Sequence, residues 1–519
     1  MSEHGATSIP MCSQDGMILQ RADSLDRGPR LSPNAHDCTH IFARSRVRAA
    51  RGRNEGEGGV KAERSYPRAT ITPKGERALV GGHPWVYEAE VEGLEPAPDS
   101  TDEPVPNGSL VDVVSRKGSY LGTGLLSQRS KIRIRIISRN ANDRFDEAFW
   151  ERKVRWAWEY RKSVMGADVG CCRVIFSEAD GFPGLIVDRF EDVLVAQVLS
   201  IGMERQKPAI FSALLKVMAE DGIRIRGIYE RNDVSNRRLE GLKETCGWYA
   251  GSAGRAVEGG LVPDAGAEGL WSGIAPIDPD SEEAARLGLG PTTTDICENG
   301  VRYHVDFAEG QKTGFFLDQK YNRQAVARLA RGRRVLDCFT HTGSFGLNAL
   351  AGGAEHVHAV DVSQSAIDMA RANARLNGCE DRMTFETANV FDLLPELEEA
   401  YGRHGRGDAG DGRGGPFDFI ILDPPAFTKS RRTVQSAERG YHEINQRAMK
   451  LLPRGGYLAT CSCSHFMDAD RFRRMLASAA DDADVQLRQI EERQQAPDHP
   501  ILWGVSETDY LKFFLFQVI

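Results

Sequence analysis

A chain of 519 residues exceeds what one hydrophobic core normally serves, so we expect two to four domains. It has the composition of a soluble protein, and it contains neither an apolar run of eighteen residues nor a basic segment followed by an apolar stretch at its start. These features argue against a membrane span and a secretory signal and make the cytoplasm the expected location. The net charge of -8 does not favour nucleic acid, but it is a weak argument because local charge decides such binding.

The ten cysteines are spread over the whole length, without the dense spacing of a disulfide scaffold or the separated Cys-x-x-Cys pairs of a zinc site. We therefore expect most of them to be reduced and buried, and we expect no metal.

Residues 1–67 are rich in Arg, Gly and Ser and lack hydrophobic periodicity, which predicts a disordered extension. Short β-like runs follow over residues 68–140, at 109–115, 120–126 and 131–138, and predict a small β-barrel. The last run is locally basic, with Lys131, Arg133, Arg135 and Arg139, and would suit RNA.

Residues 141–255 predict a central α+β domain. A helix is expected over 144–165, strands over 173–176, 184–188 and 193–199, and a second helix over 207–220. Residues 256–292 carry Gly, Ala, Pro and acidic residues in place of apolar periodicity, which predicts a linker or insertion.

The remainder, residues 293–519, alternates strands and helices in a pattern typical of an α/β Rossmann-like domain. After a hairpin strand over 300–307, the expected strands are 334–337, 356–361, 383–386, 417–422 and 456–462, with a terminal pair over 485–490 and 510–518. A Gly-rich stretch over 402–415 predicts a surface loop.

The turn after the first of these parallel strands predicts a nucleoside-type cofactor. It contains Asp337, Thr342, Gly343 and Phe345, and its small residues allow a polar ligand to approach the backbone closely. The second strand ends at Asp361, where a carboxylate can accept both hydroxyls of a ribose.

S-adenosylmethionine fits this turn better than a dinucleotide, which would prefer three glycines where the chain has only Gly343 and Gly346. Asp337 suits the ammonium group of the methionyl part but would repel a pyrophosphate. Asn389, after the third strand, can reach the adenine edge. A Rossmann-like fold with a degenerate pocket is the alternative.

Two further motifs follow the fourth and fifth strands, at the edge where such folds bind substrates. Asp423-Pro424-Pro425 predicts contact with a planar, hydrogen-bonding target, although this motif also occurs in ordinary turns. Cys461 and Cys463 bring thiols to the same edge. Carbon 5 of cytosine needs a thiolate at carbon 6 before it can take a methyl group, so either cysteine could be a nucleophile, or both could be small core residues.

With these motifs the sequence resembles the RlmI-type 23S ribosomal RNA (cytosine-C5)-methyltransferases over residues 68–519. The resemblance rests on seven ordered segments of the chain: Gly82-His83-Pro84-Trp85-Val86, residues 178–188, Tyr229-Glu230-Arg231, residues 310–319, Asp423-Pro424-Pro425, Ser462-Cys463-Ser464 and Pro497-Asp498-His499-Pro500.

The resemblance implies a PUA domain for RNA docking, a central domain of EEHEE type and a seven-stranded class I methyltransferase domain. By motif matching it implies that Cys463 is the nucleophile and that Asp423 orients the cytosine and borders the cofactor. It also implies that Phe316, Asp318 and Gln319 help to close the cofactor pocket. We expect the cofactor's sulfonium charge and the polar strand end to lower the pKa of the Cys463 thiol.

The substrate implied is large-subunit ribosomal RNA, with no membrane partner. Ala426 stands where other RNA cytosine-C5 enzymes carry a second cysteine, so the base that removes the C5 proton is unidentified. A guanine-N7 methyltransferase, which needs no thiolate, and a non-catalytic RNA-binding assembly factor are the alternatives. The sequence leaves open whether the chain acts alone or as a homodimer.

Overall fold

The computed structural model describes residues 64–98, 100, 104–253, 256–257, 260–261, 276–402, 413, 415–428 and 431–519. Most of the extension predicted over residues 1–67 and most of the loop predicted over 402–415 lie outside the described residues. The boundary at residue 67 is wrong, because the Arg64 side chain donates to Asp112 and Thr123 and therefore belongs to the fold.

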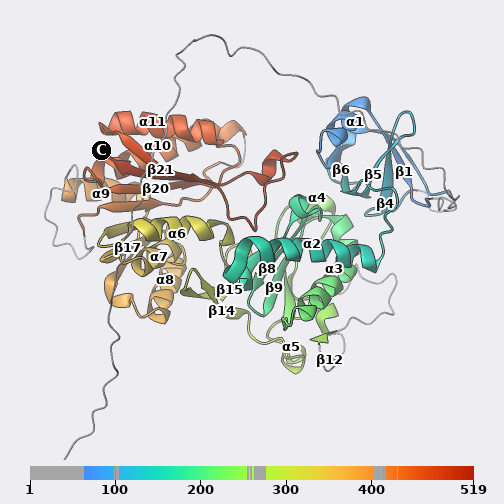
Figure 1. The fold of residues 1–519 in the computed structure, drawn as a ribbon, viewed down its shortest axis with the longest axis horizontal. Coiled ribbons are helices and arrows are strands. Elements are labelled where there is room, and N and C mark those ends of the chain that lie inside the picture. Colours follow the sequence, from blue (N-terminus) through green and yellow to red (C-terminus); the bar gives the residue numbers. More distant parts are fainter. Residues whose placement is uncertain are drawn as a thin grey trace, which may run out of the picture. The chain divides into compact units, whose positions relative to one another are not determined.

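The N-terminal β domain is built on one six-stranded sheet with the strand order β2-β6-β5-β4-β1-β3 (Figure 1). Its elements are β1 (Arg68–Ile71), α1 (Pro73–Val80), β2 (Trp85–Tyr87), β3 (Val91–Glu95), β4 (Leu110–Ser115), β5 (Tyr120–Leu126) and β6 (Ile132–Ser138). The strand predicted to be basic is β6, but Arg133 is paired with Glu88 and Arg135 with Glu240. Both arginines within β6 are therefore compensated within the chain, and Lys131 and Arg139 lie just outside the strand.

The central domain packs two long helices with a five-stranded sheet of order β11-β10-β9-β8-β7. Its elements are α2 (Glu147–Met165), β7 (Cys171–Phe176), β8 (Leu185–Phe190), β9 (Val193–Val198), α3 (Ile201–Glu220), β10 (Gly227–Arg231), α4 (Arg237–Glu240) and β11 (Cys246–Trp248). Three strands precede α3, one more than the EEHEE pattern has. The helix α3 begins six residues earlier than predicted, because the Ser200 hydroxyl accepts from the Met203 N–H and caps it.

The linker or insertion predicted over 256–292 contains regular structure in its described part. It holds the short strands β12 (Ala256–Val257) and β13 (Gly260–Leu261) and the helix α5 (Glu282–Arg286). Ile277 forms a β-bridge with Trp248, and Ala284 and Leu289 are buried in the same core cluster. Three apolar residues spaced over thirteen positions give no regular period, so the sequence pattern did not reveal this packing.

The C-terminal domain begins with the hairpin β14 (Thr293–Glu298) and β15 (Val301–Asp306), of which the sequence predicted only the second strand. A seven-stranded sheet follows with the order β18-β17-β16-β19-β20-β22-β21. Its strands are β16 (Arg334–Cys338), β17 (His356–Asp361), β18 (Met383–Thr387), β19 (Phe419–Leu422), β20 (Tyr457–Ser462), β21 (Leu487–Arg493) and β22 (Lys512–Val518). The strands β18, β17, β16, β19 and β20 are parallel, and β22 runs antiparallel to both of its neighbours.

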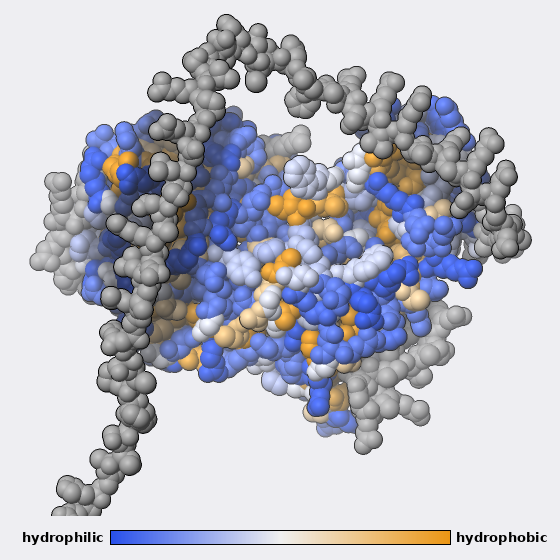
Figure 2. Space-filling model, viewed as in Figure 1, coloured by the Kyte–Doolittle hydropathy of each residue, from blue (hydrophilic) through white to orange (hydrophobic). Residues whose placement is uncertain are grey.

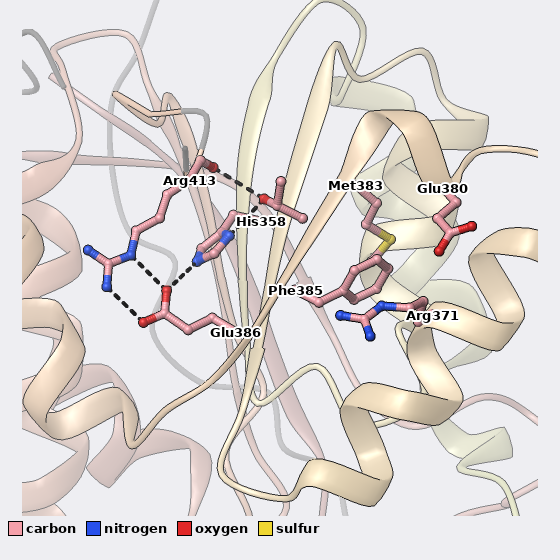
Figure 3. Close-up of a pocket in the computed structure, with 8 residues that line it drawn as sticks. His358, Arg371, Glu380, Met383, Phe385, Glu386 and Arg413 are labelled. Atoms are coloured by element: carbon pink, nitrogen blue, oxygen red, sulfur yellow. Dashed lines mark hydrogen bonds and ion pairs between the residues drawn. The ribbon is translucent and has the colours of Figure 1, made fainter. Parts of the chain in front are cut away.

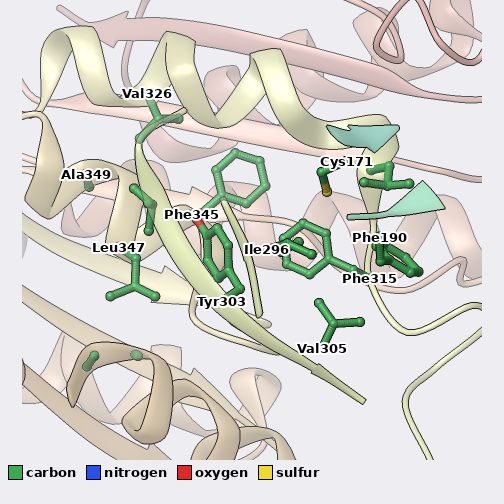
Figure 4. Packing of buried hydrophobic residues seen from close by; sticks show 14 of the residues in the cluster. Cys171, Phe190, Ile296, Tyr303, Val305, Phe315, Val326, Phe345, Leu347 and Ala349 are labelled. Atoms are coloured by element: carbon green, nitrogen blue, oxygen red, sulfur yellow. The ribbon is translucent and has the colours of Figure 1, made fainter. Parts of the chain in front are cut away.

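Helices cover both faces of this sheet (Figure 1). They are α6 (Lys320–Leu329), α7 (Ser344–Ala351), α8 (Gln364–Leu376), α9 (Val390–Tyr401), α10 (Val434–Leu451) and α11 (Ala469–Ala483). Val335 belongs to the core that contains Phe345 of α7, whereas the next residue, Leu336, belongs to the core that contains Tyr441 of α10. This alternation is the pattern of strands buried on both faces. Figure 4 shows Tyr303, Phe315 and Phe345 packed together in the first core.

On the face drawn in Figure 2, hydrophilic residues cover most of the area and apolar residues form small separate patches. None of the described helices is both long enough and apolar enough to cross a membrane.

Candidate active site

The turn after β16 is organised around the buried carboxylate of Asp337. Its Oδ2 accepts from the Thr340 hydroxyl at 2.6 Å and from the Gly346 N–H at 2.9 Å. Its Oδ1 is buried and has no hydrogen-bond partner among the described residues. Burial raises the pKa of Asp337 to about 7, so a cationic ligand would relieve the cost of its ionisation.

The same turn is held in an unusual backbone conformation. Phe339, His341 and Gly343 have φ values of 62°, 50° and 77°, in the left-handed region. Asp361 at the end of β17 accepts from the His341 N–H through Oδ2 and from the Ser363 N–H through Oδ1, each at 3.0 Å. Each Asp361 oxygen uses one lone pair in this way and keeps the other for a ligand hydroxyl.

Three other residues were predicted to bind the cofactor, and they differ in the groups that they can present to a ligand. The Thr342 hydroxyl is buried without a described partner, as the Asp337 Oδ1 is. Asn389 is exposed at the end of β18, where its amide caps α9 and donates to Asp392 at 2.8 Å. The Phe345 side chain is buried in the core, so only its backbone can face a ligand.

The opposite wall is the segment between β15 and α6. The Asp318 side chain is buried; its Oδ2 accepts from the Tyr510 hydroxyl at 2.7 Å, and its Oδ1 has no described partner. Gln319 donates from Nε2 to Asp423 Oδ1 at 2.9 Å. The Phe316 ring lies 5.0 Å from the ring of His341, measured between centroids, and thereby joins this wall to the turn.

The two cysteines occupy different environments at the end of β20. Cys461 is buried within the strand, whereas Cys463 comes just after the strand and is partly exposed. Burial, and then the charge of Asp423, raises the pKa of Cys463 to about 11. The strand end therefore does not lower this pKa as predicted; among the largest influences on it, the ammonium groups of Lys312 and Lys512 act in that direction.

Three residues near the site carried no role in the sequence prediction. Tyr510 holds Asp318, and the Lys312 ammonium lies 4.8 Å from the centre of the Phe316 ring. Lys512 donates from Nζ to the carbonyl oxygens of Ser464, at 2.6 Å, and Tyr510, at 2.7 Å. Lys312 lies within residues 310–319, one of the segments on which the family resemblance rests. No local signal distinguished Tyr510 and Lys512 from the other residues of the predicted terminal strand.

The unpaired acceptors of the site fit S-adenosylmethionine. Buried oxygens without partners cost free energy, and Asp337 and Asp318 present two such atoms. A ligand with an ammonium group supplies N–H donors and positive charge together, which a neutral or anionic ligand would not do.

A hollow of about 670 Å³ lies elsewhere, along the edge strand β18 (Figure 3). His358 and Arg413 both contact Glu386 there, at 3.0 and 2.7 Å. The hollow is lined by none of the predicted site residues.

Comparison with known proteins agrees with this geometry. Residues 276–517 match the family model of S-adenosylmethionine-dependent methyltransferases, and residues 69–139 match that of PUA-like domains. A curated relative from Erwinia tasmaniensis, named ribosomal RNA large subunit methyltransferase I, is 36% identical over 86% of this chain and 99% of its own length. A relative of the same name from Photobacterium profundum is 37% identical over 85% of this chain and 96% of its own.

The fold is also found among solved structures. A protein from Streptococcus mutans, described as a SAM-dependent methyltransferase, superposes with a TM-score of 0.63 at 18% identity. The match covers 87% of this chain and 99% of the other.

Proposed function

The chain belongs to the family of ribosomal RNA large subunit methyltransferases I, and on that premise we propose that it methylates carbon 5 of a cytosine in large-subunit ribosomal RNA. The observation that carries the proposal is the position of the Cys463 thiol beside Asp423, at the sheet edge that also holds Asp337 and Asp361. A guanine-N7 enzyme would have no use for a thiol there.

The methyl group comes from S-adenosylmethionine. We propose that Asp337, Thr342 and Gly343 hold its methionyl part, that Asp361 holds its ribose, and that Asn389 lies at the adenine. The carboxylate of Asp318 would balance its positive charge from the opposite wall, where Phe316 and Gln319 complete the pocket. Phe345 contributes through its backbone.

Cys463 has to lose its proton before it can attack. The thiolate then adds to carbon 6 of the cytosine and forms a carbon–sulfur bond, which makes carbon 5 electron-rich enough to accept the methyl group. Removal of the carbon 5 proton breaks the carbon–sulfur bond and releases the thiolate.

Asp423 is placed to orient the base. Its Oδ1 accepts from Gln319 and its carboxyl also accepts from the Cys461 thiol, and the remaining lone pairs can accept from the cytosine amino group. Burial raises the pKa of Asp423 to about 6, so the carboxyl is mostly ionised at neutral pH and can accept that hydrogen bond.

The test is a covalent trap. RNA with 5-fluorocytosine at the target should form a stable adduct with the unmodified enzyme, because fluorine at carbon 5 cannot leave as a proton. Cys463→Ala should lose both the adduct and methyl transfer while it still binds the cofactor. Cys461→Ala is the matched control and should be milder. Methylation by Cys463→Ala without any adduct would instead support alkylation of a guanine nitrogen.

A further inference from the structure

A second hollow, of about 640 Å³, opens where α10 begins and the loop joins β20 to α11. We call it the α10–α11 hollow; its lining includes Arg432, His465, Phe466 and Arg471. None of the residues assigned above to the cofactor or the nucleophile lines it.

The loop that lines this hollow follows the nucleophile directly in the chain and is held by hydrogen bonds at Ser464. Ser464, directly after Cys463, donates from Oγ to the Thr428 carbonyl at 3.1 Å, and its own carbonyl accepts from Lys512 at 2.6 Å. His465 and Phe466 come next in the chain. Two residues of extended chain span at most about 7 Å, so His465 lies within that distance of Cys463. A nucleotide bonded to one held at Cys463 would therefore reach the hollow.

The hollow presents two rings, the exposed cation of Arg432 and one carboxylate, that of Asp468, whose Oδ1 accepts from the Arg471 N–H at 2.8 Å. The rings of His465 and Phe466 lie edge to face, with centroids 5.5 Å apart. Arg471 is paired with Glu438 at 3.1 Å. Arg432 is exposed and has neither an ion pair nor a hydrogen bond with any of the residues that the structure describes.

This combination matches the chemistry of a nucleotide. A base of any identity can stack on an aromatic ring, and a phosphate is attracted by a guanidinium group. Sequence-specific enzymes that take one base out of its stack also need contacts on the flanking nucleotides.

We propose that the α10–α11 hollow binds the nucleotide adjacent to the target base in the substrate RNA, with its base against Phe466 and His465 and its phosphate at Arg432. This inference rests on the proposed function for its substrate, RNA, but not on cytosine being the methylated base. It assigns to the loop after the nucleophile a second task, which is to hold the strand while the target base is in the pocket.

The first test compares matched variants on ribosomal RNA from a strain that lacks the enzyme. Phe466→Ala should lower kcat/KM by roughly 5-fold to 150-fold, the effect of losing one stacked base. Arg432→Ala should reduce the salt dependence of RNA binding by about one phosphate contact. Phe385→Ala, at the other hollow, and Arg454→Ala, an exposed arginine at the opposite sheet edge, are the controls and should change neither quantity.

The second test locates the contact. Phe466 is replaced by the photoreactive p-benzoylphenylalanine, and the cross-linked nucleotide is mapped together with the methylated one. The cross-link should fall on an immediate neighbour of the methylated nucleotide, whichever base that is. A cross-link at a distant nucleotide, or Phe466→Ala and Arg432→Ala behaving like their controls, would overturn the proposal. Loss of the 5-fluorocytosine adduct would count against the cytosine assignment alone.

Discussion

At the scale of single residues, burial opposes the ionisation of the carboxyl and thiol groups of the site. Burial raises the pKa of Asp337 to about 7, far above the value of about 3.9 for an exposed aspartate. As the pH rises from about 4 to about 7, the unfolded chain ionises this carboxyl while the folded, cofactor-free protein keeps it protonated, so the protein loses stability over this range. A cation bound at Oδ1 recovers that stability.

This predicts that the affinity for S-adenosylmethionine falls as the pH drops below about 7, by up to tenfold per unit, because a neutral Asp337 cannot pair with the ammonium group. Calorimetry at pH 5.5 and pH 7.5 measures the effect. Asp337→Asn should bind weakly and almost independently of pH, and an unchanged pH profile in that variant would assign the dependence to another group.

Cofactor binding should also stabilise the fold. At a hundredfold excess over the dissociation constant, the free energy of unfolding should rise by about 2.7 kcal/mol. Asp361→Ala should remove most of the corresponding thermal shift, since its Oδ2 is held at His341 of the turn that holds the ligand and both oxygens keep a lone pair for the ribose. Asp368→Ala, an exposed aspartate on α8, is the control. A full shift in Asp361→Ala would refute the ribose assignment.

The thiol of Cys463 gives a second pH dependence at this scale. Because burial holds its pKa at about 11, alkylation by iodoacetamide should accelerate about tenfold per unit from pH 7 to pH 10. Burial lowers the pKa of Lys512 to about 8, so Lys512→Met should slow the reaction mainly below about pH 8, where the lysine carries its charge, and Lys512→Arg should restore it. S-adenosylmethionine should speed alkylation more than S-adenosylhomocysteine, which lacks the sulfonium charge.

At the scale of elements, the hairpin β14–β15 is tied to the cofactor wall by one buried arginine. Arg323 of α6 donates from Nη1 to Glu298 at the end of β14 and from Nη2 to the Phe316 carbonyl, each at 2.6 Å. Both charged side chains of this ion pair are almost completely buried. The hairpin therefore sets the position of the segment that carries Phe316, Asp318 and Gln319.

Breaking this pair should be costly, because it leaves Glu298 charged and unpaired in the core. We expect Arg323→Met to destabilise the protein by about 3–5 kcal/mol and to weaken cofactor binding. The double variant Arg323→Met/Glu298→Gln should recover part of the stability, since the unpaired charge is gone. Thermal unfolding of both variants checks this; equal destabilisation would mean that packing, and not charge, dominates.

At the scale of the whole molecule, the domains are joined by polar contacts between distant segments. The Trp85 indole N–H donates to Glu178 at 3.0 Å, and the Ser127 hydroxyl donates to Glu240 at 2.6 Å. Asp498, near the end of the chain, accepts from the Arg173 N–H of β7 at 2.9 Å. Trp85, Glu178 and Asp498 belong to motifs on which the family resemblance rests. These motifs therefore have a structural role, which is to join the domains.

RNA binding should depend on the N-terminal β domain, as its match to a PUA-like family suggests. Lys131 and Arg139 are its exposed cations on or beside β6. Replacing both by Glu should weaken binding to ribosomal RNA and change its salt dependence. Deleting residues 1–60 should leave binding unchanged, and Arg133→Ala should have less effect because Arg133 is already paired. Equal losses in all three would contradict the role of this surface.

The sequence by itself determined the order of strands and helices and the edge at which chemistry occurs. Asp337, Asp361, Asp423 and Cys463 lie at or just after the ends of parallel strands, and parallel strands bring such ends to one edge of a sheet. Periodicity and turn residues are local signals, so these elements were predicted to within a few residues. The helix α3 starts six residues earlier than predicted, and the elements that were not predicted include the strands β10, β11 and β14 and the helix α5.

The tertiary structure alone decided which distant groups complete the site. Tyr510 reaches Asp318 across 192 positions of sequence, and Lys512 reaches Ser464 across 48, because β22 runs antiparallel beside β20. The packing of Ala284 in the core and the burial that raises the pKa of Cys463 also depend on contacts between segments that are distant in the sequence. Burial and long-range contact are properties of the packed chain, and no local pattern of residues encodes them.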